Sequence, residues 1–282
     1  MTFLTSSTGA DSILPDEYAE LITGPVMAQS IAFAEPVATV VPTDSHTFHI
    51  PVLKEDVASE WVSEGDEITP DDPTLDEVRV TPAKVAGLTV VSRELADDST
   101  PAAQELVGAS LARSIVGKID QAFLGNLASP APAGLESVAS TEANTLSLTG
   151  ESFKEFGLDP FAWAVSVAEA DGSNVSAFLA HPDDALAMAQ MVDAVDSRRP
   201  LLADARAVMD RPVLVNRHVT PGTIWAVDRS RIFTVLRQDT TIAVSDGPFF
   251  TSDSVAIRAT MRVGFGFPHP GSVLRIQLEA AD

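Results

Sequence analysis

The sequence predicts an α+β fold, and three features of its residue pattern predict it. Residues 47–53 and 77–82 alternate apolar with other side chains at the two-residue period of a strand, on either side of the acidic, proline-bounded segment 68–73. Residues 101–127 carry apolar side chains at helical spacing, and from residue 133 onward short strands alternate with helices. We therefore expect an extended β-hairpin and a long helix, followed by an α/β body.

The hairpin, called the ribbon below, has Phe48, Ile50 and Val52 at alternate positions of its first arm. Its return arm begins at residues 77–82, and we expect it to continue through residues 88–91. Ten extended residues reach roughly 30 Å. A two-stranded ribbon of that length is marginally stable alone in water. It therefore needs a surface to lie on, and a neighbouring copy of the chain is the natural candidate.

The long helix has the expected start signals and one apolar side. Ser99 or Thr100 is placed to cap it, and Pro101 suits its first turn. Five apolar residues recur every four positions: Val107, Leu111, Ile115, Ile119 and Phe123. Such a stripe indicates a helix that packs along its whole length against a core or an interface.

Segments before and after the ribbon and helix are shorter. Residues 13–22 predict a short helix, and residues 34–42 predict an extended arm or a strand. Two helices are expected to begin at residues 159 and 181. The expected short strands are residues 177–180, 212–216, 223–228, 232–236, 241–245, 255–263 and 272–278.

Composition excludes several classes of protein. The chain has 282 residues, no cysteine and a formal net charge of −22. Disulfides, thiolate metal sites and a cysteine nucleophile are therefore excluded. The negative charge argues against a general nucleic-acid binder, although it permits a container for nucleic acid. Residues 1–10 lack a basic residue and an apolar run, and no stretch approaches the roughly 18 apolar residues of a membrane span, so we expect a soluble protein.

Charge is also distributed unevenly along the chain. Residues 1–100 contain four basic and nineteen acidic residues, whereas eleven of the fourteen arginines lie from Arg198 onward. Between copies of the chain, this asymmetry would let an acidic ribbon lie across an arginine-bearing body. Such complementarity guides pairing and association rate more than affinity.

Candidate catalytic and metal motifs all have a simpler structural explanation. His46 and His49 form an H-x-x-H pair, but in a strand residues three apart point to opposite faces. Residues 181–184, His-Pro-Asp-Asp, are typical of the start of a helix, whose exposed amides favour aspartate. Residues 264–266, Gly-Phe-Gly, lack the third glycine and following helix of a dinucleotide site. We expect no catalytic residue, no cofactor and no metal.

Several short phrases occur in an order that matches a known family. They are Glu-Trp-Val-Ser-Glu-Gly at residues 60–65, Val-Ser-Arg-Glu-Leu at 91–95, Ile-Asp-Gln-Ala-Phe-Leu-Gly at 119–125, Ala-His-Pro at 180–182, Arg-Pro-Val-Leu-Val at 211–215, Pro-Gly-Thr-Ile-Trp-Ala-Val-Asp at 221–228 and Arg-Ala-Thr-Met-Arg at 258–262. Their order resembles that of the major capsid protein of tailed bacteriophages with the Hong Kong 97-type fold, which encapsulins share. No single phrase is specific; the order across residues 45–265 is.

The resemblance implies a division of the chain into four parts. These are an N-terminal arm at residues 1–45, an extended β-hairpin loop at 46–90, a peripheral domain with a long spine helix at 91–132 and 238–268, and an axial α/β domain at 133–237 and 269–282. The implied function is that of a structural shell protein. Copies would assemble as hexamers and pentamers into an icosahedral head that encloses double-stranded DNA without sequence-specific binding.

The resemblance also implies where the protein is found and what surrounds it. The chain would be made in the host cytoplasm and located in the virion, with a portal and a decoration protein as further partners and no membrane. Some family members begin with a scaffolding segment of around a hundred residues, whereas here about 45 precede the loop. We therefore expect a separate scaffold protein. Some members also join a loop lysine to a late asparagine; Lys54 and Lys84 are present, but no asparagine follows Asn216, so we expect no such crosslink.

Nine residues are expected at contacts between copies. They are Phe48, Ile50, Val78 and Val80 on the ribbon's contact face, Trp61 as the apolar anchor, Glu64 and Asp66 on its acidic flank, and Arg258 and Arg262 on the receiving body. Two alternatives stay open. One is an encapsulin-type compartment for cargo, and the other is a soluble hydrolase with an unrecognised carboxylate site.

Overall fold

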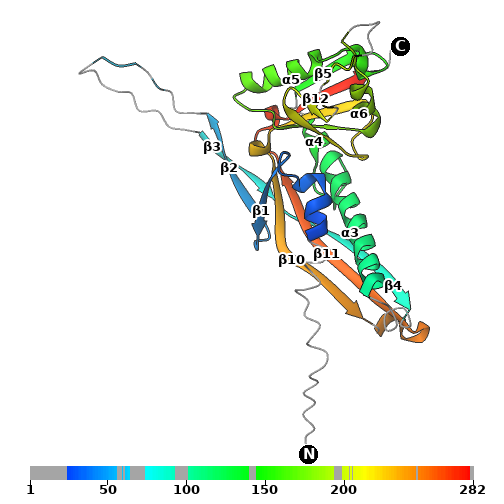
Figure 1. The fold of residues 1–282 in the computed structure, drawn as a ribbon. Coiled ribbons are helices and arrows are strands. Elements are labelled where there is room, and N and C mark those ends of the chain that lie inside the picture. The colour runs from blue at the N-terminus through cyan, green and yellow to red at the C-terminus, as the bar shows by residue number, and fades with distance from the viewer. Residues whose placement is uncertain are drawn as a thin grey trace, which may run out of the picture.

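The computed structural model describes residues 24–55, 59, 61–63, 74–92, 101–139, 144–193, 199–202, 204, 206–245 and 247–279. Two bodies built on separate sheets lie end to end, and a two-stranded ribbon points away from them (Figure 1). The predicted helix at residues 13–22 and the expected caps Ser99 and Thr100 lie outside the described residues. No helix in the described part is long and apolar enough to cross a membrane.

The strands and main helices follow one another as a mixed α and β chain, which confirms the predicted class. The strands are β1 Thr39–Thr43, β2 Phe48–Glu55, β3 Thr74–Val80, β4 Ala83–Ser92, β5 Asn144–Thr149, β6 Ala177–Ala180, β7 Ala207–Val208, β8 Arg211–Val215, β9 Thr223–Val227, β10 Phe233–Ser245, β11 Ser254–Gly266 and β12 Leu274–Glu279. The α-helices after β4 are α3 Pro101–Leu124, α4 Leu135–Ala139, α5 Asp159–Ala170 and α6 Pro182–Ala189, with short 3-10 turns such as η1 Ile31–Phe33.

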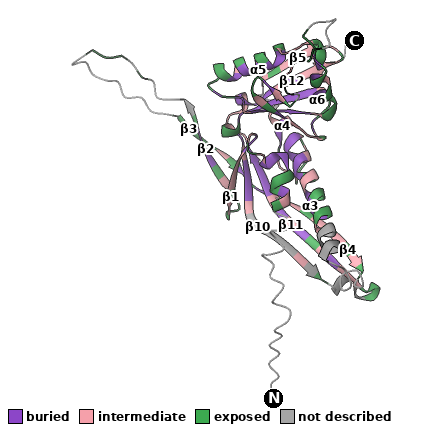
Figure 2. Ribbon diagram, viewed as in Figure 1, coloured by how far each residue is buried: buried purple, intermediate pink, exposed green. Residues whose placement is uncertain are grey.

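The first body is a four-stranded sheet in the order β1-β10-β11-β4. β1 runs parallel to β10, and β11 runs antiparallel to both β10 and β4. Helix α3 lies on one face, where Leu111 approaches Gly87 of β4 so closely that a side chain at residue 87 would require the Leu111 side chain to move. Buried residues gather where α3 meets the sheet near the second body, and exposed ones at the far end (Figure 2).

Helix α3 confirms the predicted long helix and its apolar stripe. It ends at Leu124, not at residue 127 as expected. Of the predicted stripe, Leu111, Ile115, Ile119 and Phe123 are buried, and the Val107 side chain lies outside the described set. Because these side chains share one side of the helix, the stripe packs into the hydrophobic core of its own subunit.

The second body is a six-stranded sheet in the order β5-β12-β9-β6-β8-β7, accompanied by α5 and α6. Strands β6 and β9 are buried at every position, as expected for central strands covered on both faces. Phe161 of α5 meets Phe178 of β6 edge to face, with ring centroids 5.2 Å apart. The aromatic pair helps to hold α5 on the sheet.

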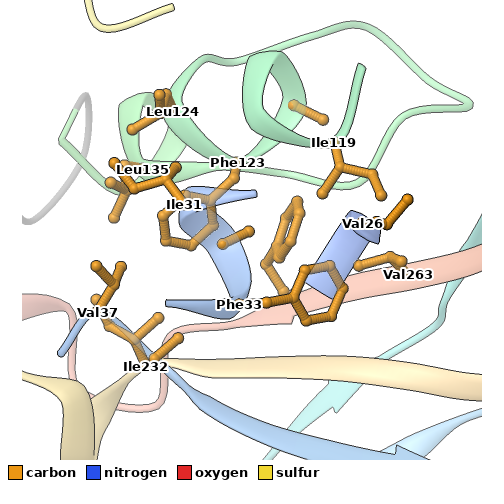
Figure 3. Close-up of a cluster of buried hydrophobic side chains, with 14 of the residues drawn as sticks. Val26, Ile31, Phe33, Val37, Ile119, Phe123, Leu124, Leu135, Ile232 and Val263 are labelled. Carbon is orange, nitrogen blue, oxygen red and sulfur yellow. The ribbon is translucent and has the colours of Figure 1, made fainter. Parts of the chain in front are cut away.

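One apolar cluster joins the two bodies to the segment before β1. Figure 3 shows Val26, Ile31 and Phe33 facing Ile119 and Phe123 of α3. The same cluster includes Trp225 and Val227 of β9 and Val263 and Phe265 of β11. The N-terminal segment therefore fills the junction between α3 and both sheets.

Two expected strand limits are wrong. The strands expected at residues 232–236 and 241–245 are parts of one strand, β10, which begins at Phe233 and has a pairing irregularity between Arg237 and Thr241. Residues 88–91 do not continue the ribbon; they lie in β4, which pairs with β11 over its whole length. The chain leaves the ribbon at residues 81–82, where Pro82 has no amide hydrogen to extend the ladder.

Candidate assembly surface

The ribbon is an antiparallel pair with a defined register. Phe48 lies opposite Val80, and Ile50 lies opposite Val78. Directly opposite residues share one face of a two-stranded sheet. One face of the ribbon is therefore apolar over its root, as the alternation in the sequence predicted.

This apolar face packs against the chain's own body. Ile50 and Val80 form a cluster with the fully buried Val235 of β10, and Phe48, Val78 and Phe233 pack against it. Ile50 keeps 5% of its surface exposed and Val80 keeps 4%. Ile50 and Val80, which were expected at contacts between copies, are therefore covered by their own subunit. Phe48 and Val78 are half-buried in the same cluster.

Two glycines of β11 make this approach possible. A Cβ on Gly264 would lie 2.7 Å from Val80 Cγ1 and 3.2 Å from Pro82 Cα, and one on Gly266 would lie 2.5 Å from Ile50 Cδ1. Both distances to side chains are shorter than real carbon contacts. The Gly-Phe-Gly motif thus serves close packing of the ribbon root on the sheet, a use of strand glycine that needs no ligand.

The outward face of the ribbon root is polar. His49 Nδ1 lies 2.9 Å from Glu77 Oε2, and Arg79 Nε donates to Glu77 Oε1 at 2.7 Å. The Arg79 hydrogen bond, and after it the His49 bond, lower the pKa of the Glu77 carboxyl. His49 therefore has a carboxylate partner, and in the described part of the chain no group of three His, Asp or Glu side chains is placed to hold a metal ion.

Beyond its root the ribbon carries apolar side chains in full contact with solvent. Trp61 is completely exposed, at 104% of its reference surface, and Leu75 is exposed at 71%. Glu64 and Asp66, expected on the same acidic flank, lie outside the described residues. Exposed apolar side chains gathered on one projection mark an interaction surface.

The face of the four-stranded sheet opposite α3 carries the two expected arginines. Arg258 is exposed and lies opposite Leu88 of β4, which is 62% exposed. Arg262 is half-buried and lies between Lys84 of β4 and Arg237 of β10 in the same register row. We call this row with Arg258 the basic sheet face. It combines positive charge with uncovered apolar surface.

A buried carboxylate at the junction of the bodies escaped the sequence analysis. Asp120 of α3 is 3% exposed, and its Oδ1 accepts hydrogen bonds from Ser30 Oγ at 2.6 Å and from the Ile31 amide at 3.0 Å. Burial raises the pKa of Asp120, and the hydrogen bonds partly offset that effect. The signal was available, because Asp120 directly follows a residue of the buried apolar stripe.

The His181 motif has the structural role that was favoured from the sequence. His181 precedes α6, and its Nδ1 accepts a hydrogen bond from the Asp183 amide at 3.3 Å. Asp184 Oδ2 accepts from the Gly222 amide at 2.9 Å. Burial raises the pKa of Asp184, and that hydrogen bond opposes the rise. These contacts start the helix and fasten the turn before β9.

Comparison with known proteins decides what this arrangement belongs to. The sequence model of the phage capsid family matches residues 12–278. The chain belongs to the phage capsid family. Members of this family are structural shell proteins, so the chain is a major capsid protein, as the order of its sequence phrases predicted.

Solved capsid structures share the fold. The capsid of an empty GTA particle, computed with C5 symmetry, matches with a TM-score of 0.71 at 22% identity, covering 87% of this chain and 88% of that one. A structure from Microbacterium phage Oxtober96 gives a TM-score of 0.72 at 18% identity, covering 89% and 91%. One from Mycobacterium phage Bobi gives 0.70 at 20% identity, covering 91% of both chains. No curated protein matches the chain.

These matches bear on the alternatives. The family that matches is the phage capsid family, so an encapsulin-type compartment is not favoured. Membership of the phage capsid family supports association of this capsid protein with copies of itself and a place in the virion. A capsid protein does not require the carboxylate site of a hydrolase.

Proposed function

We propose that this capsid protein forms the head of a tailed double-stranded DNA phage by assembling as hexamers and pentamers. Family membership carries the proposal. The formal net charge of −22 supports enclosure of DNA without sequence-specific binding, since an acidic wall does not hold phosphates. Under the same proposal it is made in the host cytoplasm with a separate scaffold protein, a portal and a decoration protein.

The four-part division of the chain is part of this proposal, with its boundaries moved to match the two sheets. The four-stranded sheet with α3 corresponds to the peripheral domain, so the N-terminal arm ends before β1 and the peripheral domain takes all of β10. The six-stranded sheet with α5 and α6 corresponds to the axial domain. The pairing of β4 with β11 favours ending the extended loop at Val80 instead of residue 90.

Contact between copies would join two surfaces of opposite charge. From Glu55 to Val78 the chain has ten acidic residues and no Lys or Arg, and this stretch includes the exposed Trp61. The basic sheet face offers Arg258 and Arg262 beside the exposed Leu88. We place the ribbon of one copy near the basic sheet face of the next. The opposite charges would align the two copies, and the apolar side chains would supply the affinity.

Sedimentation velocity and negative-stain imaging of the purified full chain test the function. The expected result is closed particles made of many copies. If the chain alone stays monomeric, adding the scaffold protein of the same phage should produce the particles. A lone species of 29.7 kDa under every salt and protein concentration, even with the scaffold protein present, would contradict the proposal.

Charge reversal tests the basic sheet face. Arg258→Glu should slow assembly by about tenfold or more at low salt, because it places a carboxylate before an acidic partner. Arg206→Glu reverses an exposed arginine of the other body and is the matched control. Equal assembly rates for both variants would remove Arg258 from the interface.

A further inference from the structure

An apolar pocket opens at the edge of the four-stranded sheet. It has a volume of about 390 Å³ and lies between the C-terminal half of α3, the start of β4 and the loop that follows α3. Ile119, Ala122 and Phe265 are buried lining residues, and Pro130 lies in the loop wall. The small side chain of Ala122 faces a space that a larger one would reduce. This volume is within the range of pockets that accept a small organic group, about 300–1,000 Å³.

Two lysines give the pocket a charged border. Lys84 of β4 and Lys118 of α3 both line it and both are exposed. They are two of only four lysines in a chain with forty acidic residues. Lys84 also lies opposite Arg262 on the edge strand β4 and therefore belongs to the basic sheet face as well. An occupant with an apolar centre and acidic neighbours would suit this border.

Trp61 is an apolar side chain with acidic neighbours in the sequence, and it therefore matches the expected occupant of the pocket. Its side chain is fully exposed, and the nearest charged residues on both sides of it in the sequence are acidic. The ribbon that carries it points away from the body of its own subunit (Figure 1). A large aromatic side chain that is fully exposed to water is unfavourable unless it is covered in the assembly.

We propose that the Trp61 indole of one copy inserts into this pocket of a neighbouring copy, while acidic residues flanking Trp61 pair with Lys84 and Lys118. The inference rests on the proposed shell function and adds the receiving site. Binding a tryptophan in a desolvated pocket with charges at the rim is the arrangement typical of an interface hot spot. The interface would thus depend on one side chain and one pocket.

Cysteine pairing tests the contact directly, because the natural chain contains no cysteine. Ala128 is an exposed pocket residue, so particles of the Trp61→Cys, Ala128→Cys double variant should form disulfide-linked oligomers under mild oxidation. The control pairs Trp61→Cys with Leu186→Cys, at an exposed position on α6. Crosslinking in the control to the same extent, or in neither variant, overturns the inference.

If the cysteine variants do not assemble, tryptophan fluorescence tests whether Trp61 is buried in particles. The difference spectrum between wild type and Trp61→Phe isolates Trp61 from Trp163 and Trp225. On assembly its emission should shift to shorter wavelength, and iodide quenching should fall at least about threefold, since burial excludes water and ions. Unchanged quenching in intact particles means that another segment or protein fills the pocket, and the inference is then wrong.

Reversal of a border charge completes the test. Lys118→Glu should reduce particle yield at low salt at least about tenfold relative to Lys154→Glu, which changes an exposed lysine of the other body. Equal yields would overturn the pairing with lysine. Intact particles with an exposed Trp61 would refute the pocket assignment alone, whereas absence of particles in the wild type would refute the shell function itself.

Discussion

Asn216 donates a hydrogen bond of 2.7 Å from its Nδ2 to Oδ2 of Asp120. This bond joins the loop after β8 to α3, while the other oxygen of Asp120 holds Ser30 and Ile31. One buried carboxylate therefore ties the N-terminal segment and both bodies together. An assembly subunit must hold its bodies in a fixed orientation, and this contact contributes to doing so at the point where the bodies meet.

Removal of this carboxylate should destabilise the subunit. Asp120→Ala leaves the Ser30 hydroxyl and the Ile31 amide without their acceptor, and each stranded buried donor costs about 1–3 kcal/mol. Urea unfolding of the subunit measures the loss. Asp193→Ala, at an exposed aspartate, should change the free energy of unfolding by less than about 0.5 kcal/mol. Similar effects of the two substitutions would show that the Asp120 contacts are energetically unimportant.

The raised pKa of Asp184 predicts a pH dependence with a definite sign. A carboxyl whose pKa lies above the ordinary aspartate value of 3.8 favours folding when protonated, and that contribution is lost as the pH rises through the folded-state pKa. Asp184→Asn keeps an oxygen for the Gly222 amide but has no charge to bury. The free energy of unfolding of the wild type should therefore fall relative to the variant as the pH rises above the ordinary aspartate value of 3.8 and through the raised pKa of Asp184. The similar shift of Asp120 is present in both proteins and cancels in their difference. A difference that is constant with pH, or that changes in the opposite direction, contradicts the prediction.

Close packing of the ribbon root predicts intolerance of a single methyl group. Gly264→Ala would place Cβ at 2.7 Å from Val80 and 3.2 Å from the Pro82 backbone, so the ribbon or β11 must shift. Overpacking of this kind costs about 1–3 kcal/mol, measurable by urea unfolding. Gly108→Ala is the control, because nothing lies within 4 Å of its added methyl group and alanine favours a helix by about 1 kcal/mol. Equal stability of the Gly264 variant and the wild type would show that the ribbon root is loosely held.

Assembled particles should contain no isopeptide bond between copies. The lysines of the loop region, Lys54 and Lys84, have no asparagine partner after Asn216 in the sequence. A denaturing gel of reduced, mature particles should therefore show this chain as one band near 29.7 kDa. A ladder of heavier bands, with lysine joined to another side chain by mass spectrometry, would contradict this.

Much of the local structure could be predicted because the spacing of apolar residues, and the residues that begin or end a helix or strand, can be read from short stretches of sequence. The two-residue alternation at Phe48 and Ile50 determined the ribbon, and Leu111, Ile115 and Ile119 determined the buried side of α3. The start of α6 followed from proline and aspartate after His181. The order of short phrases was enough to predict the capsid family.

Only the tertiary structure decided which surface each apolar face contacts. Alternation showed that one face of the ribbon is apolar, but it carries no information on whether that face meets a neighbouring copy or β10 and β11 of the same chain. Gly264 and Gly266 settled this for Ile50 and Val80, since only their missing side chains let the ribbon root lie so close. In the same way Asp120 meets Ser30 and Asn216 across 90 and 96 positions of sequence, a distance over which no local pattern acts. The sequence by itself determined which elements form and which family they belong to; long-range packing determined which of their faces remain free for assembly.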